Sequence, residues 1–220
     1  MKSVLISIQP KYCELIVNGK KTIEVRKTRP KLETPFKCYI YCTKEKSINN
    51  VFLIYGGEKY ACFGDYRNAC TSDADGKVDC YIGNGKIIGE FVCDKIEEFY
   101  CASVPYQKEN NLGYGRFVDD GVYKVDGWHE GVVFERNDMY IDTMLKNKDI
   151  EKMCLTAQEL FNYIGIGKYF YALHISRLRI YDKPKELKEF FTPMGKRPSY
   201  MVERPPQSWQ YVEELKEKQK

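Results

Sequence analysis

The sequence lacks any long apolar run. No stretch approaches the roughly 20 consecutive apolar residues that a membrane-spanning helix needs, and the first residues do not have the pattern of a secretory leader. Internal repeats and low-complexity tracts are also missing. We therefore expect a cytoplasmic protein with no membrane partner.

The sequence also lacks closely spaced pairs of cysteines. The chain has 9 cysteines but no CxxC pair. Cytoplasmic cysteines are usually reduced, so we expect free thiols and no disulfide framework. Cys62, Cys70 and Cys80 are too widely spaced for a zinc motif. We therefore expect no metal, and nothing in the sequence calls for another cofactor.

The sequence also has only a small excess of positive over negative charge. The chain has 35 basic and 31 acidic residues, which gives a formal net charge of +4. Any attraction to phosphates must therefore come from local clusters of basic residues. With 220 residues, 43% of them hydrophobic, the chain can bury a core, and we expect a single domain over residues 1–220.

The N-terminal residues show two periodicities. Residues 3–9 form a short apolar run typical of a strand, and Pro10 then suits the first turn of a helix. Asn18 and Gly19 predict the end of that helix, because glycine accepts the left-handed cap conformation. Residues 22–27 alternate apolar and polar side chains, which predicts a second strand.

Further elements are expected along the chain. Thr156 and Glu159 form a capping-box pattern, which predicts a helix that ends at Gly165. We also expect helices near the C-terminus, and the apolar or aromatic runs elsewhere predict strands. The additional predicted strands are residues 36–42, 50–55, 85–100 and 169–182, and the additional predicted helices are residues 183–191 and 208–220.

Residues 101–148 are rich in glycine, aspartate and tyrosine, and their hydrophobic residues follow neither the helical nor the strand spacing for long. We interpret this segment as a large insertion and residues 191–220 as a C-terminal extension. Strands dominate the rest, with helices between them. The sequence therefore predicts the α+β class, with a mixed, barrel-like sheet and peripheral helices.

The stretch NGKKTIEVR carries the most chemistry. It contains the pattern G-x-K-x-x-E-x-R at Gly19, Lys21, Glu24 and Arg26. Strand alternation places Glu24 and Arg26 on one face, about 7 Å apart. An arginine fork suits a phosphate or a base edge, and a carboxylate accepts from an exocyclic amine. The alternative is a surface ion pair that contributes about 0–1 kcal/mol.

This pattern and its surroundings resemble the ASCH domain family. That family belongs with the PUA-like folds, which are small β-barrels with helices at the rim, and it is associated with RNA binding and RNA-linked regulation. The likeness covers most of residues 1–43, 84–100 and 153–190. The insertion and the C-terminal extension are similar to those of the longer members found in bacteria and their phages.

The resemblance implies an RNA-binding or modified-nucleotide-binding cleft beside the motif. His174 lies in the strand predicted at 169–182, and Ser176 shares its face by alternation. A histidine satisfied by backbone groups is an equally good interpretation. The predicted nucleic-acid-binding residues are Lys11, Lys20, Lys21, Glu24, Arg26, His174 and Ser176.

Two other functions stay open. Some relatives of this fold hydrolyse the amide of an acetylated cytidine nucleoside with a lysine, a threonine and a glutamate. Lys21 matches that lysine, but Glu24 stands where the threonine falls, so a hydrolase here would use Lys21 with Glu24 as a general base. The other alternative is a regulatory adaptor, whose insertion at 101–148 or C-terminal tail binds a partner protein.

Overall fold

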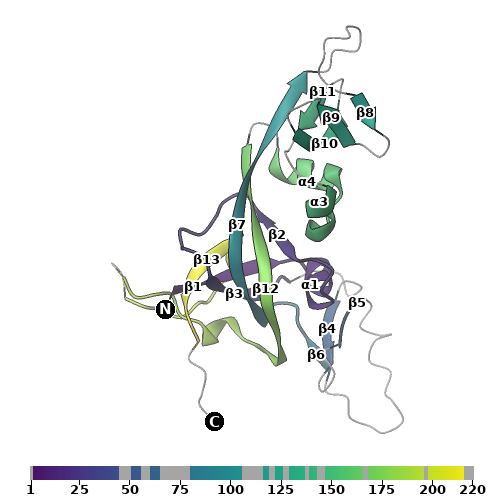
Figure 1. The fold of residues 1–220 in the computed structure, drawn as a ribbon. Coiled ribbons are helices and arrows are strands. Elements are labelled where there is room, and N and C mark those ends of the chain that lie inside the picture. Colours follow the sequence, from purple (N-terminus) through teal and green to yellow (C-terminus); the bar gives the residue numbers. More distant parts are fainter. Residues whose placement is uncertain are drawn as a thin grey trace, which may run out of the picture. The chain divides into compact units, whose positions relative to one another are not determined.

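The computed structural model describes eleven stretches of the chain, which fall into two compact units (Figure 1). The described residues are 2–44, 51–55, 60–64, 80–105, 116–118, 122–125, 129–136, 139–142, 147–165, 168–195 and 198–215. Unit 1 comprises Met1–Lys20, Pro30–Asp94 and Ile175–Lys220, and unit 2 comprises Lys21–Arg29 and Lys95–His174.

The sheet of unit 1 is mixed. Strand β1 (Lys2–Ile8) pairs in parallel with β3 (Phe36–Cys42) and antiparallel with β13 (Trp209–Glu213). Strand β3 in turn pairs antiparallel with the first part of β7 (Ile87–Pro105). Because β1 has a neighbour on each side, it is buried from Ser3 onwards, and the apolar character of the run follows from that position.

Aromatic side chains fill much of the core of unit 1. Tyr39 meets Phe190 edge to face, with ring centroids 4.9 Å apart. These rings pack with aliphatic side chains from both ends of the chain, so the C-terminal extension is part of this core. The buried cluster is Leu5, Tyr39, Tyr41, Ile87, Tyr181, Phe190, Val202 and Val212.

Helix α1 (Pro10–Val17) begins with proline in its first turn and ends before Gly19, whose φ is +71°. Both boundaries confirm the sequence prediction. The remaining strands of unit 1 make a small antiparallel sheet with β4 between its neighbours. Its strands are β4 (Val51–Tyr55), β5 (Tyr60–Gly64) and β6 (Cys80–Ile82).

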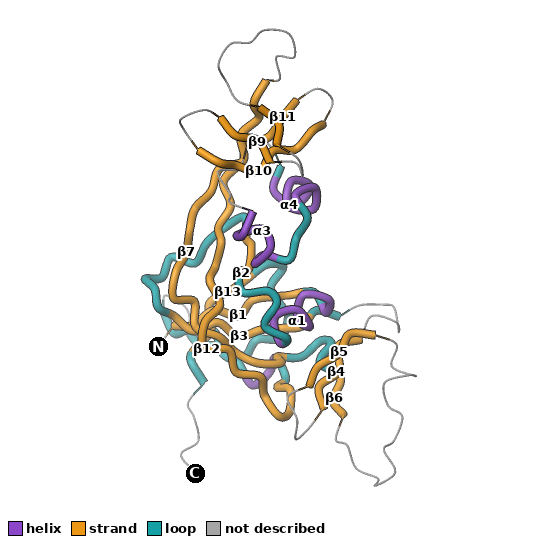
Figure 2. Tube along the Cα trace, turned by 45° about the vertical axis from the view of Figure 1, so that its right-hand side comes forward, coloured by secondary structure: helices purple, strands orange, loops and turns teal. Residues whose placement is uncertain are grey.

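Unit 2 is built around a short strand, β2 (Ile23–Arg26), which pairs antiparallel with β12 (Lys168–Lys185). Helix α3 (Asn147–Met153) lies beside β2 (Figure 2), and α4 (Ala157–Ile164) follows it in the chain. The side chains of Thr156 and Glu159 make the predicted capping box before α4. The core cluster is Ile23, Val25, Met153, Leu160, Ile164, Phe170 and Ala172.

The predicted insertion at 101–148 contains regular structure that its composition did not predict. Four antiparallel strands follow the end of β7, and α3 begins within the same segment. The limits of the insertion as a separate part of the domain stay a prediction. The four strands are β8 (Arg116–Val118), β9 (Val122–Val125), β10 (His129–Arg136) and β11 (Met139–Asp142).

Both predicted C-terminal helices are wrong. The helix expected at 183–191 is replaced by the end of β12 and a single 3₁₀ turn, η1 (Leu187–Glu189). The helix expected at 208–220 begins instead as strand β13, because residues 209–213 pair with β1. Tertiary pairing has overridden the helical propensity of both segments. Among the described residues, no helix is long and apolar enough to cross a membrane.

Candidate nucleic-acid interface

The three charged residues of the motif meet in unit 2. Arg26 Nη2 lies 3.0 Å from Glu24 Oε1, and Lys21 Nζ lies 3.4 Å from Glu24 Oε2. Only 3% of Lys21 and 7% each of Glu24 and Arg26 is exposed. The motif is therefore a buried triad of two cations around one carboxylate, with a net positive charge.

The pairing of β2 with β12 explains this arrangement. Glu24 lies opposite Leu173, and Arg26 lies opposite Tyr171, so these side chains share one face of the sheet. Ile23 and Val25 point to the other face and join the core cluster. The predicted alternation is confirmed, but the surface-pair alternative is wrong because both faces of β2 are covered.

Lys21 is held by the end of α3. Its ammonium group donates a hydrogen bond of 2.6 Å to the carbonyl oxygen of Met153, and the backbone N–H of Thr22 donates to the carbonyl of Lys152. The last carbonyls of a helix lack partners within the helix, and they attract cations. Lys21 therefore ties the motif to α3, which no local pattern in the sequence indicated.

One oxygen of the buried Glu24 carboxylate can accept a further hydrogen bond. Among the described residues, Glu24 Oε2 accepts no hydrogen bond, although Lys21 stands 3.4 Å away. A buried carboxylate that keeps its charge needs strong partners. The two neighbouring cations supply this compensation by charge, while one acceptor position on Glu24 is left open.

Tyr163 on α4 links the triad to the surface. The Arg26 side chain donates a hydrogen bond to the Tyr163 hydroxyl, and the Lys27 ammonium lies 5.0 Å from the centre of the Tyr163 ring. Burial raises the pKa of Tyr163 above its ordinary value of 10.0, so the phenol is neutral at pH 7. With 38% of the residue exposed, Tyr163 is an aromatic group that a ligand can reach.

The motif lies in a stretch rich in basic residues. Residues 21–29 contain four basic side chains and one acidic one. Lys21 and Arg26 are buried, whereas Lys27 and Arg29 are exposed. The two further basic residues after the motif, Lys27 and Arg29, are visible in the sequence, but only the tertiary structure brings Tyr163 to Lys27.

His174 lies on the other face of β12. It stands opposite Ile23, so alternation separates its side chain from those of Glu24 and Arg26. Its ring Nε2 is 2.6 Å from Glu97 Oε2. The pKa of Glu97 is lowered, mainly by the hydrogen bond that Lys95 donates and further by His174, against the opposing effect of burial. His174 thus belongs to a separate ionic cluster.

The other predicted site residues lie in unit 1. Lys11 is exposed, with its ammonium 4.5 Å from the centre of the Tyr12 ring. Lys20 is exposed directly after Gly19. Ser176 donates a hydrogen bond of 2.9 Å to the carbonyl of Val92. A role of these three residues in nucleic-acid binding stays a prediction.

Comparison with protein families shows which family the region around the motif matches. A family model described as the ASCH domain matches residues 6–114, which include the whole triad. The chain belongs to the ASCH domain family. The predicted α+β class, with a mixed sheet and peripheral helices, is confirmed. No curated protein matches the sequence.

Solved structures of ASCH proteins are similar to the chain at low identity. The crystal structure of ASCH from Zymomonas mobilis has 13% sequence identity and a TM-score of 0.41, over 96% of this chain and 87% of that one. A point mutant of the same Zymomonas mobilis protein has 12% identity and a TM-score of 0.41, over 97% of this chain and 91% of that one.

Proposed function

We propose that this ASCH-domain protein binds single-stranded RNA, or a modified nucleotide, at the surface that Lys27 and Tyr163 form beside the buried triad, with the exposed Arg29 two residues along the chain as a further phosphate contact. The observation that carries the proposal is the contact of Arg26 with both Glu24 and Tyr163. It fixes an exposed aromatic side chain next to exposed positive charge, which is the combination that single strands bind. The family's association with nucleic acids supports the same conclusion.

Each exposed residue has a distinct role in this proposal. Lys27 and Arg29 contact phosphates, since a flexible ammonium and a planar guanidinium both bind phosphate oxygens. Tyr163 offers its ring to a base, and its neutral hydroxyl stays bonded to Arg26. Such stacking tolerates any base, so the contacts provide affinity without a strong sequence preference.

The triad supports this surface from below. Lys21 is fixed by the Met153 carbonyl, and Glu24 holds Arg26 in place. Because the three charges sum to one positive charge, they also add to the attraction for phosphate. The spare acceptor of Glu24 is the group that would meet an exocyclic amine if a modified base entered more deeply.

No contact among the described residues favours the amidohydrolase alternative. The Lys21 ammonium is engaged with a carbonyl and a carboxylate, and Glu24 lies between the cations of Lys21 and Arg26. Incubating the protein with an N-acetylated cytidine nucleoside should release no acetate. Turnover that is lost in Glu24→Gln would replace the binding proposal with the hydrolase one.

The role of Tyr163 is the sharpest test of the proposed surface. Tyr163→Leu removes the ring, and it should weaken binding of a short single-stranded RNA by about 1–3 kcal/mol. Tyr163→Phe keeps the ring and should bind nearly as the wild type does. Fluorescence anisotropy with a labelled RNA measures both variants.

Two results would overturn the proposal. Equal affinity of Tyr163→Leu and wild type for RNA would remove the stacking role. Failure of the wild type to bind any single strand, duplex or modified nucleoside at low salt would remove the function itself. Capture of a partner protein by the 101–148 insertion or the tail would then favour the adaptor alternative.

A further inference from the structure

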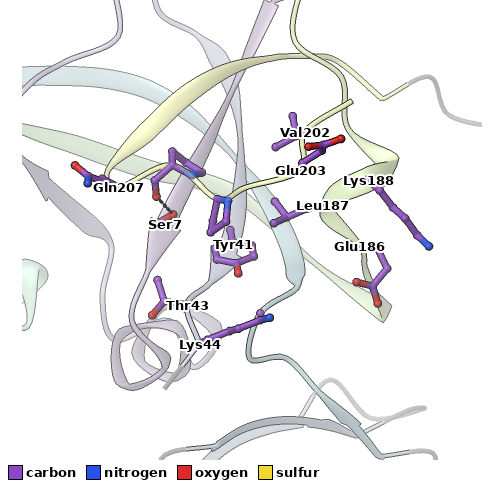
Figure 3. A pocket seen from close by; sticks show the side chains of 13 residues that line it. Ser7, Tyr41, Thr43, Lys44, Glu186, Leu187, Lys188, Val202, Glu203 and Gln207 are labelled. Carbon is purple, nitrogen blue, oxygen red and sulfur yellow. Dashed lines mark hydrogen bonds between the residues drawn. The ribbon is translucent and has the colours of Figure 1, made fainter. Parts of the chain in front are cut away.

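Unit 1 contains a cavity that shares no residue with the proposed RNA surface. Its volume is about 630 Å³, within the usual range for sites that bind small ligands. It is lined by the ends of β1 and β3, by the turn before β7, and by residues of the 186–207 segment (Figure 3). The walls therefore come from both the matched ASCH region and the C-terminal part of the chain.

Tyr41 gives this cavity a hydroxyl that has no hydrogen-bond partner among the described residues. The residue is 2% exposed, and its ring belongs to the core of unit 1. Within the described part of the chain, its hydroxyl makes no hydrogen bond, although Tyr41 lines the cavity. Burial raises the pKa of Tyr41 above 10.0, so the hydroxyl is a neutral group that can donate one hydrogen bond and accept others.

Lys44 adds a positive charge at the same cavity. Its aliphatic stem lies across Gly85, where a Cβ atom would be only 2.8 Å from Lys44 Cε. Gly85 also has a φ of +80°, a conformation that favours glycine. The glycine turn thus makes room for the lysine stem beside the cavity wall, with Lys44 on one side of Tyr41 in Figure 3.

The carboxylate of Glu186, which also lines the cavity, has its own cation. Lys86 Nζ lies 3.0 Å from Glu186 Oε1. This pairing reduces the repulsion that Glu186 would exert on an incoming anion. An anionic group near Lys44 is therefore electrostatically acceptable.

Apolar side chains form part of the lining. Leu187 and Val202 lie on the other side of Tyr41 from Lys44 in Figure 3, with Glu203 beside Val202. Pro205 and Pro206 also line the cavity. Ser7 donates a hydrogen bond of 2.6 Å to the carbonyl of Pro206, which holds the proline segment against β1. Rigid proline and aliphatic surfaces suit the face of a planar ring.

We infer that this cavity binds a nucleoside monophosphate. The base packs against the apolar lining residues, the Tyr41 hydroxyl bonds to the base or the sugar, and Lys44 contacts the phosphate. The inference shares no residue with the proposed RNA surface, so either can fail alone. The Tyr41 hydroxyl, the apolar lining residues and the Lys44 ammonium together match a planar ring that carries an anionic group.

Isothermal titration with adenosine monophosphate and cytidine monophosphate tests the inference, with adenosine and inorganic phosphate as separate ligands. Lys44→Ala should weaken binding of the better monophosphate about tenfold, and binding of the nucleoside much less. Tyr41→Phe should weaken both about fivefold, because it removes a single hydrogen bond. Lys2→Ala removes an exposed lysine elsewhere in unit 1 and should bind normally.

The design separates the cavity from the RNA surface. The double variant Lys27→Ala and Arg29→Ala should bind the monophosphate as the wild type does. Tyr41→Phe should retain the melting temperature of the wild type, since the hydroxyl it removes has no partner among the described residues. If Tyr41→Phe does not fold, Lys44→Ala, which alters an exposed side chain, still decides the question.

Three results would overturn the inference. The first is no binding of either monophosphate at millimolar concentration. The second is wild-type affinity in Lys44→Ala. The third is inorganic phosphate binding as tightly as the monophosphate, which would mean an anion site without a place for the base.

Discussion

Arg26 Nη2 lies 3.0 Å from Glu24 Oε1, and only 9% of each side chain is exposed. This pair is therefore part of the interior of unit 2, even though its sequence is that of a polar strand face. Burying an ion pair costs desolvation, and removing one member leaves the other charge uncompensated. The energetic consequence of mutation is accordingly much larger than for a surface pair.

Arg26→Met should lower the free energy of unfolding by about 3–5 kcal/mol, because Glu24 then keeps only Lys21 as a buried counter-charge. The combined change Lys21→Met, Glu24→Leu and Arg26→Met should recover most of that loss, since no buried charge is left. Urea unfolding measures both variants. A loss below about 1 kcal/mol in Arg26→Met would show that the pair behaves as an exposed one.

Glu97 should make a contribution to stability that is lost in acid. Its folded pKa is lowered from 4.5 by Lys95 and His174, so its stabilising effect is complete above 4.5 and is lost as the pH falls through the folded pKa. Glu97→Gln should therefore flatten the decline of stability below pH 4.5. The effect should be modest because Glu97 is one-third exposed. Glu33→Gln, at an exposed position, should leave the acid decline unchanged.

Tyr181 should make the stability of the fold decrease at high pH, whereas Glu97 makes it decrease at low pH. Its hydroxyl donates a hydrogen bond of 2.7 Å to Glu90 Oε2, and burial raises its pKa well above 10.0. The folded protein keeps a proton that the unfolded chain releases near pH 10, so stability is complete below that pH and falls as the pH rises above it. Tyr181→Phe should flatten this alkaline decline, whereas Tyr200→Phe, at an exposed position, should not.

The sequence also predicts that all 9 cysteines are reduced. In the structure Cys13, Cys38, Cys42, Cys93 and Cys154 are thiols that form no disulfide. Thiol titration of the denatured protein without reductant should find 9 reactive groups. Two or more missing thiols would indicate a disulfide among the remaining cysteines.

The local elements near the motif were predictable because local signals determine them. Pro10 and Gly19 mark the ends of α1, and alternation in residues 23–26 gives the faces of β2 correctly. The burial of Lys21 was not predictable, because Met153 lies far along the chain and no nearby residue indicates the contact. A polar strand face looks the same in sequence whether solvent or α3 covers it.

The C-terminal errors have the same physical origin. Residues 208–220 contain a charged pattern that favours a helix, yet Trp209–Glu213 pairs with β1. The free edge of β1 decides the conformation, and the sequence of residues 208–220 does not contain that information. The position of Tyr163 beside Arg26 likewise depends on how α4 packs, so the exposed part of the candidate site was missed.

The salt dependence of RNA binding tests the central claim most directly. The affinity of wild type and of the double variant Lys27→Ala and Arg29→Ala for one single-stranded RNA should be measured over a range of salt concentrations. If both residues contact phosphates, the slope of log affinity against log salt should shrink by about 0.7 for each lost contact, with weaker binding at low salt. An unchanged slope and unchanged affinity would contradict the assignment of this surface to RNA.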